Sequence, residues 1–238
     1  MSSIHLIHGA WHGRWCWEKL IPKLERNGHT VVARDLPGLG LDRTPAAEVT
    51  LQAYADAVYE ALAKETEPAV VVGHSMGGVV ISEVAERIPE KIKALVYLSA
   101  YLLAPGQSLQ EVATSDPETA EGGKYLLVDG LTCTIRPDVI RELFYGSCTD
   151  EDAAHAATLL VPQPLIAFTT PVHVTAERFG RIPKFYIQCL QDRIVSPSLQ
   201  GKMAKTTPCE RIFSLNTDHS PFLSVPDELA AQLSQIVS

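Results

Sequence analysis

Residues 69–80, AVVVGHSMGGVV, place a glycine-rich turn between two short apolar runs. The first run is β-branched and typical of a buried strand, and the second predicts a helix. Gly73, Ser75 and Gly77 give the turn between them the spacing G-x-S-x-G. This spacing is typical of a nucleophile elbow, a strained strand-to-helix turn that exposes a serine hydroxyl.

The elbow also explains the residues around Ser75. A side chain at Gly73 or Gly77 would collide with neighbouring backbone. Because the next helix begins at the serine, the N–H of Met76 points, with the positive end of the helix dipole, at an oxyanion formed when Ser75 attacks a carbonyl. The alternative is an idle serine in a glycine-rich turn, and the strand and helix context favours the elbow.

Composition favours one soluble α/β domain that handles a small molecule. The chain has 238 residues, of which 46% are hydrophobic, enough for a sheet buried on both faces. Its formal net charge of -8, without a basic run, argues against nucleic acid or an anionic membrane as a partner.

The N-terminus and the cysteines favour a cytoplasmic protein. The chain enters an apolar strand at once, without a signal-peptide pattern, and no apolar stretch is long enough to span a bilayer. The five cysteines are odd in number and lack C-x-x-C spacing, which favours reduced thiols over disulfides or a zinc site.

Strand and helix patterns alternate along the chain, which predicts parallel strands joined by right-handed crossovers. Besides the elbow strand, strands are predicted at residues 4–7, 30–33, 93–98, 184–190 and 211–215. Helices are predicted at residues 15–26, at about 50–64 with Thr50 as N-cap, after Gly78, from about 197 and from about 224.

The alternation stops near Leu103 and resumes near Pro183, which predicts a small cap inserted into the fold. We therefore expect a single domain with its core in residues 1–102 and 182–238 and its cap at about 103–181. Within the cap, the sequence predicts a hairpin turning at Asp129-Gly130, a helix at 137–144, and a helix capped by Thr149 and stopped by Pro162.

A serine nucleophile needs a base and a residue that orients the base. Asp192 follows the strand at 184–190, and His219 follows the strand at 211–215. Each alone is typical of a turn aspartate or a solvated loop histidine, but the order Ser75, Asp192, His219 is that of a hydrolase triad. Asp218 is the weaker candidate for the acid, because a sequence neighbour would have to fold back to reach the ring.

The loop after the first strand, HGAWHG at residues 8–13, lies at the same predicted sheet edge. Its glycines let the backbone approach a substrate, so the N–H of Ala10 is the candidate for the second oxyanion donor. His8 and His12 invite a metal interpretation, which we reject because Gly9 and Gly13 disfavour a helical i,i+4 pair and no carboxylate completes a zinc spacing.

Along nearly its whole length the chain resembles the plant-type methyl esterase and hydroxynitrile lyase branch of the α/β-hydrolases. The resemblance rests on HGAWHGRWCWEKL (8–20), GHSMGG (73–78), YLLAPG (101–106), FYG (144–146) and DHSPF (218–222). It implies an α/β-hydrolase fold, that is, a mostly parallel sheet flanked by helices with a small cap over the pocket. Members of this branch often form homodimers.

The resemblance also implies hydrolysis of small carboxylic esters by Ser75, His219 and Asp192, with oxyanion donors at Ala10 and Met76 and without a cofactor or metal. Two alternatives stay open: a hydroxynitrile lyase on the same scaffold, and a ligand-binding receptor or carrier with a hydrolase fold. Lyases of this branch carry a threonine after the first-strand histidine and a lysine after the catalytic histidine. This chain has Gly9 and Ser220 there, which favours the esterase.

Overall fold

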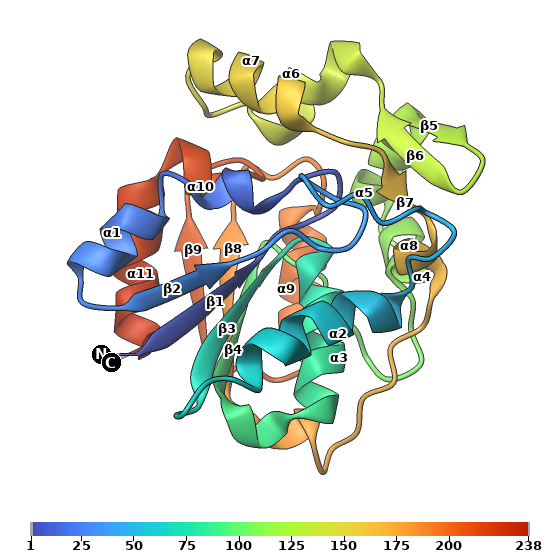
Figure 1. Cartoon of the computed structure of the whole chain (residues 1–238). Coiled ribbons are helices and arrows are strands. Elements are labelled where there is room, and N and C mark those ends of the chain that lie inside the picture. The colour runs from blue at the N-terminus through green and yellow to red at the C-terminus, as the bar shows by residue number, and fades with distance from the viewer. Residues whose placement is uncertain (1, 238) are drawn as a thin grey trace.

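The computed structural model describes residues 2–237. A six-stranded sheet runs through the molecule with helices on both faces (Figure 1). Its strand order is β2-β1-β3-β4-β8-β9, and every neighbouring pair is parallel, as predicted. The strands are β1 (Ser3–Ile7), β2 (Thr30–Ala33), β3 (Ala69–His74), β4 (Ile92–Leu98), β8 (Lys184–Cys189) and β9 (Arg211–Leu215).

Successive residues of β3 point to opposite faces of the sheet, and all six are buried. Ala69 and Val71 join one apolar cluster, whereas Val70 and Val72 join the other. The first cluster packs under α2 (Leu51–Leu62), α3 (Gly77–Arg87) and α9 (Pro197–Thr206). The second packs under α1 (Ile21–Arg26), α10 (Pro221–Ser224) and α11 (Pro226–Val237). A strand buried on both faces explains the unbroken apolar run in the sequence.

The segment between β4 and β8 adds a second, smaller sheet and several helices. In Figure 1, α6, α7 and the β5–β6 hairpin lie beyond the carboxyl ends of the large sheet's strands. The elements are α4 (Leu109–Thr114), α5 (Pro117–Gly122), β5 (Leu126–Asp129), β6 (Thr132–Ile135), α6 (Ile140–Phe144), α7 (Asp150–Leu159), β7 (Gln163–Pro164) and α8 (Ile166–Thr169). Short 3₁₀ helices complete the chain: η1 (Arg14–Trp17), η2 (Pro89–Lys91), η3 (Gly123–Tyr125), η4 (Pro137–Val139) and η5 (Phe179–Arg181).

The two helix N-caps and the hairpin turn that the sequence predicts are confirmed. Thr50 caps α2 through its hydroxyl, which accepts from the Ala53 N–H at 2.9 Å. Thr149 caps α7 through the Asp152 N–H at 3.1 Å. The predicted hairpin turns at Gly130, whose φ of 56° lies in the left-handed region.

Two helical regions are interrupted at a proline. Residues 15–26 form η1 and then α1, because Pro22 lacks the N–H that would continue hydrogen bonding to the preceding turn. The final helix, predicted from about residue 224, is α11 from Pro226; the short α10 before it was not predicted and is separated from it at Val225, whose φ of -137° departs from the helix because Pro226 follows it. Helices α4 and α5 were not predicted, although Ser108 and Glu111 form a capping box at the start of α4.

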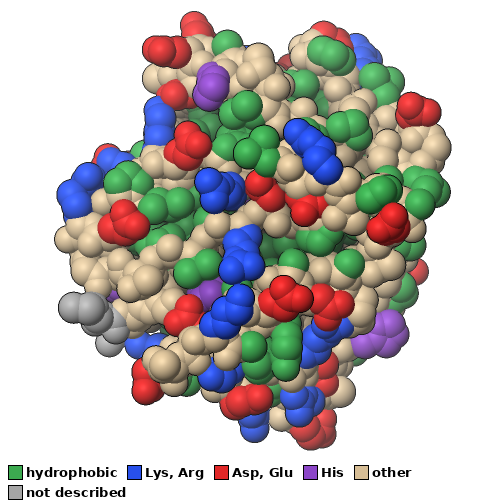
Figure 2. Space-filling model, viewed as in Figure 1, with side chains coloured by type: hydrophobic (Ala, Val, Ile, Leu, Met, Phe, Trp, Pro, Cys, Tyr) green, Lys and Arg blue, Asp and Glu red, His purple; other side chains and the backbone are tan. Residues whose placement is uncertain are grey.

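Acidic and basic side chains alternate over the face shown in Figure 2, and no continuous basic area occupies that face. Among residues 2–237, no helix is long and apolar enough to cross a membrane. All five cysteines are free thiols, and four of them are buried: Cys16, Cys133, Cys148 and Cys189.

We predict that Gly73→Ala destabilises the protein by about 3 kcal/mol, or roughly 6–12 °C in melting temperature. An added Cβ would lie 2.6 Å from the Gly77 carbonyl oxygen, which is backbone and cannot swing aside. Gly123→Ala is the matched control, because nothing lies within 4 Å of a Cβ there. Thermal unfolding of both variants tests this, and equal melting temperatures would contradict the steric argument.

Candidate active site

Ser75 lies in the turn between β3 and α3 with a φ of 54°, a left-handed conformation that is unusual for a residue with a side chain. Such a backbone costs about 1–3 kcal/mol and persists only where its surroundings hold it. The Ser75 N–H donates to the Leu98 carbonyl at 3.3 Å, and the Ser75 carbonyl accepts from the Tyr101 N–H at 3.1 Å. The neighbouring strand β4 and the residues after it therefore hold the predicted elbow in its strained form.

Three glycines allow the backbones at the elbow to approach one another. A Cβ on Gly77 would lie 2.7 Å from the Ile7 carbonyl oxygen, and a Cβ on Gly9 would lie 2.8 Å from the Ser75 Cβ. Together with the contact of Gly73 described above, these distances place the loop after β1 directly against Ser75.

The two backbone N–H groups predicted to bind an oxyanion are those of Ala10 and Met76. Ala10 lies in the loop after β1, and Met76 is the N-cap residue of α3. Within residues 2–237, neither the Ala10 N–H nor the Met76 N–H donates to another group of the protein. Both donors are thus free to bind a ligand oxygen next to Ser75.

His219 and Asp192 are in direct contact, as the sequence predicts. The His219 Nδ1 lies 2.7 Å from the Asp192 Oδ2, and both side chains are almost fully buried. Since a carboxylate only accepts, the neutral form of His219 carries its proton on Nδ1, which leaves Nε2 without a proton. That is the tautomer a general base requires.

Asp192 accepts hydrogen bonds on both oxygens from groups that are not part of the predicted triad. Its Oδ1 accepts from the N–H groups of Ile194 at 2.7 Å and Val195 at 3.0 Å. Its Oδ2 accepts from the Ser99 hydroxyl and, at 3.3 Å, from the Gln200 amide. Donors of this number compensate for burying a carboxylate and fix its orientation toward the histidine.

Asp218, the weaker candidate for the acid, has other partners. Its Oδ2 accepts from the Ser147 N–H at 2.8 Å, and its Oδ1 accepts from the Ser220 N–H at 3.1 Å. The Asp218 carboxylate therefore connects the loop that carries His219 to the segment after α6. Asp192 alone of the two aspartates contacts the His219 ring.

His74, the last residue of β3, connects this strand to the loop that carries His219. Its Nε2 donates to the His219 carbonyl oxygen at 2.8 Å, and the two imidazole rings have centroids 4.6 Å apart. Phe144, from α6, lies against the other side of His219 at a centroid distance of 5.8 Å. Ser75 and His219 are only 5% and 1% exposed, so the region is enclosed.

His8 and His12 contact the backbone of the oxyanion loop instead of each other. The His8 Nδ1 donates to the Gly9 carbonyl at 2.8 Å, and its Nε2 accepts from the Leu36 N–H at 3.1 Å. The His12 Nδ1 donates to the Ala10 carbonyl at 2.8 Å. Burial lowers the pKa of His8, and burial, with smaller contributions from nearby His219 and His8, lowers the pKa of His12 to about 3. Both rings are neutral at physiological pH.

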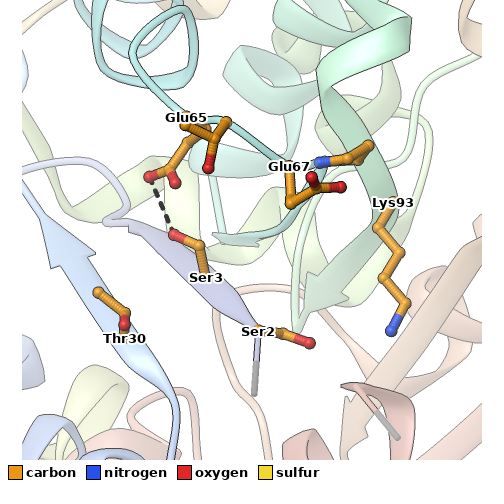
Figure 3. A pocket seen from close by; sticks show the side chains of 8 residues that line it. Ser2, Ser3, Thr30, Glu65, Glu67 and Lys93 are labelled. Atoms are coloured by element: carbon orange, nitrogen blue, oxygen red, sulfur yellow. Dashed lines mark hydrogen bonds between the residues drawn. The ribbon is translucent and has the colours of Figure 1, made fainter.

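A separate hollow of about 520 Å³ lies at the amino ends of the strands (Figure 3). Ser2, Ser3, Thr30, Glu65 and Lys93 are among its lining residues. The Ser3 hydroxyl donates to Glu65 at 2.9 Å. Ser75 lies at the opposite, carboxyl ends of the strands, where ligands of open α/β sheets bind. This hollow is therefore separate from the candidate site at Ser75.

The model of the alpha/beta hydrolase family matches residues 6–232. The chain belongs to the alpha/beta hydrolase family. It is 33% identical to putative methylesterase 14, chloroplastic, of Arabidopsis thaliana, covering 97% of this chain and 70% of that protein. It is 30% identical to methyl jasmonate esterase 1 of Vitis vinifera, covering 98% and 95%. The solved structure of a polyneuridine aldehyde esterase mutant (H244A) is similar with a TM-score of 0.90 and 26% identity, covering 100% and 99%.

These similarities confirm the predicted methylesterase-like branch of the alpha/beta hydrolase family. They support a serine esterase and do not favour the hydroxynitrile lyase. The chain spans only 55% of some chloroplastic relatives, such as putative methylesterase 15 of Arabidopsis thaliana.

The sequence predicted roles for Ser75, Asp192 and His219 but for none of the other residues that hydrogen-bond to Asp192. Ser99 and Gln200 lie at a strand end and in a helix, where serine and glutamine are ordinary. One usable signal was the position of Ser99, directly after β4 at the same sheet edge as the elbow. Gln200 gave none, because its role depends on the packing of α9 against β8.

We predict that buried neutral histidines make this member of the alpha/beta hydrolase family sensitive to acid. With a folded pKa of about 3 against 6.5 unfolded, His12 binds no proton in the folded state where the unfolded chain does. The contribution of His12 to the free energy of unfolding is complete above pH 6.5. It is lost as pH falls toward 3, at about 1.4 kcal/mol per pH unit. We expect the free energy of unfolding, measured with denaturant at pH 4–7, to rise less steeply with pH in His12→Asn than in the wild type. The difference corresponds to one bound proton, or about 1.4 kcal/mol per pH unit. Equal slopes in both proteins would contradict the pKa shift.

Proposed function

We propose that this protein is a carboxylic ester hydrolase in which Ser75, His219 and Asp192 form the catalytic triad. The observation that carries the proposal is the buried His219–Asp192 pair at the same carboxyl edge of the sheet as a serine held at a φ of 54°. Strain of this kind is typical of functional sites and has no role in a simple turn.

In the proposed mechanism, His219 Nε2 takes the Ser75 proton as the serine oxygen attacks the ester carbonyl carbon. Asp192 stabilises the imidazolium, and the N–H groups of Ala10 and Met76 bind the oxyanion. The tetrahedral intermediate collapses when His219 returns the proton to the departing alkoxide, which leaves as alcohol. Water, activated by the same histidine, then releases the acid and restores Ser75.

The substrate class we propose is the methyl ester of a small, apolar carboxylic acid. Relatives named methylesterases and methyl jasmonate esterase support the methyl group. Apolar rings support the apolar acid: Trp11 packs edge-on against Phe144 and Phe168 at 5.7 Å, and Phe144 also lies against His219. In this proposal, residues 103–181 form the cap over a core of residues 1–102 and 182–238, and the cap selects the substrate.

A homodimer, a cytoplasmic location and the absence of nucleic-acid or membrane partners stay predictions from the sequence. Several relatives carry the word chloroplastic in their names, so the location in particular depends on direct measurement.

Ser75→Ala tests the nucleophile. We expect kcat for 4-nitrophenyl acetate to fall by about four to six orders of magnitude, because the triad acts as a unit, with folding unchanged. His219→Ala should be nearly as severe. Steady-state kinetics with circular dichroism as the folding control measure this, and a Ser75→Ala variant retaining a tenth of the activity would show that another group is the nucleophile.

Measuring ester hydrolysis and cyanide release on one purified sample distinguishes an esterase from a hydroxynitrile lyase. We expect ready hydrolysis of small methyl esters and no cyanide release from mandelonitrile above buffer. Gly9 has no room for the threonine of the lyases, and Ser220 replaces the cation that binds departing cyanide, whose charge-assisted hydrogen bond is typically about 1.5–3 kcal/mol. Rapid cyanide release abolished by Ser75→Ala, with negligible ester turnover, would overturn the proposal.

A further inference from the structure

The peptide that follows the proposed oxyanion donor is held at both ends by groups outside the triad. Its carbonyl, that of Ala10, accepts from the His12 Nδ1 at 2.8 Å. Its N–H, that of Trp11, donates to the Gln163 Oε1 at 3.3 Å. His12 and Gln163 are 1% and 0% exposed, so water does not compete for these contacts.

His12 is itself oriented by Tyr145, the residue that ends α6. The Tyr145 hydroxyl lies 2.9 Å from the His12 Nε2. Because the Ala10 carbonyl only accepts, the proton of the neutral ring is on Nδ1, and Nε2 must accept from Tyr145. Burial raises the pKa of Tyr145, which keeps the phenol protonated and able to donate.

Trp11 shows why this peptide needs external support. Its φ of 61° is left-handed, which a bulky residue adopts only when held. Besides the bond to Gln163, its carbonyl accepts from the Val161 N–H at 3.0 Å, and its indole Nε1 donates to the Cys133 carbonyl at 3.0 Å. All three partners come from the segment between β4 and β8.

We propose that Tyr145, acting through His12, and Gln163 are positioning residues that hold the Ala10 N–H toward the oxyanion. The segment between β4 and β8 then completes the oxyanion hole as well as covering the substrate. This inference rests on the proposed esterase function. Neither residue touches the substrate or exchanges a proton with it. Each removes freedom from a donor that acts mainly in the transition state.

Tyr145→Phe tests the proposal, because it deletes only the hydroxyl. We expect kcat for 4-nitrophenyl acetate to fall by about tenfold with KM within roughly twofold, as when a transition-state contact is weakened. Affinity for trifluoroacetophenone, which forms a tetrahedral adduct with a serine, should fall by the same factor. Gln163→Met should give the same pattern and serves as the test if Tyr145→Phe does not fold.

Tyr97→Phe is the matched control. Its hydroxyl is equally buried and bonded, at 2.8 Å to Ser82, but belongs to β4 and α3. We expect an unchanged kcat in this variant. Unchanged kcat in both Tyr145→Phe and Gln163→Met, a loss confined to KM, or an equal loss in Tyr97→Phe would overturn the proposal.

Failure of the esterase function is distinguishable from failure of this inference. A wild-type protein that hydrolyses none of the esters contradicts the esterase alone. In ¹⁵N-histidine-labelled wild type, the proposal expects His12 as the neutral Nδ1–H tautomer between pH 5 and 8, with its Nε2 signal shifted in Tyr145→Phe. An Nε2–H tautomer of His12 would overturn the proposed chain of hydrogen bonds from Tyr145 through His12 to the Ala10 carbonyl, whatever the activity of the enzyme.

Discussion

The close approach of three backbones at the elbow is the constraint on which the rest of the structure depends. Strand β3, the first turn of α3 and the loop after β1 meet where Gly73, Gly77 and Gly9 leave no room for a Cβ. This contact brings Gly9 against Ser75, whose left-handed conformation is held by its hydrogen bonds to Leu98 and Tyr101. At Gly73 and Gly77 the contacting atoms are backbone and cannot relax as side chains do, so the fold itself sets the geometry of Ser75 and of the proposed oxyanion donors.

Charge is arranged around this contact so that one carboxylate is fully compensated and the neighbouring rings are neutral. Asp192 receives five hydrogen bonds, including the one from His219. Burial lowers the pKa of His12 to about 3 and holds the pKa of His74 well below its usual value. A neutral surrounding matters because a second imidazolium would oppose the positive charge that His219 gains during catalysis in the proposed mechanism.

The parts of the fold that could be predicted from the sequence are those fixed by local chemistry. Alternating apolar patterns predicted six parallel strands. Thr50 and Thr149 marked two helix N-caps and Gly130 marked the hairpin turn, because each of these residues acts on the backbone next to it. The same logic found Ser75, Asp192 and His219, which all follow strands. Ser99, Gln200 and Tyr145 escaped it, since their partners lie 93, 8 and 133 residues away and are chosen by packing. The interruptions at Pro22 and Pro226 were readable from proline chemistry but were masked by the helical pattern on either side.

The segment between β4 and β8 is joined to the large sheet by contacts that converge on the catalytic edge. Asp218 accepts from the Ser147 N–H beside the base, Trp11 is bonded to three residues of the segment beside the oxyanion loop, and Lys19 pairs with Asp152 at 2.6 Å farther out. The exposed ion pair contributes little stability, whereas the buried bonds of Trp11 to Gln163 and Cys133 cannot be lost without leaving donors unsatisfied. Phe144, also from this segment, lies 5.8 Å from His219 between ring centroids, and His219 is only 1% exposed. In the proposed mechanism the segment therefore contacts both the base and the loop that carries the Ala10 donor, so substitutions at Tyr145 or Gln163 act on the chemistry as well as on substrate choice.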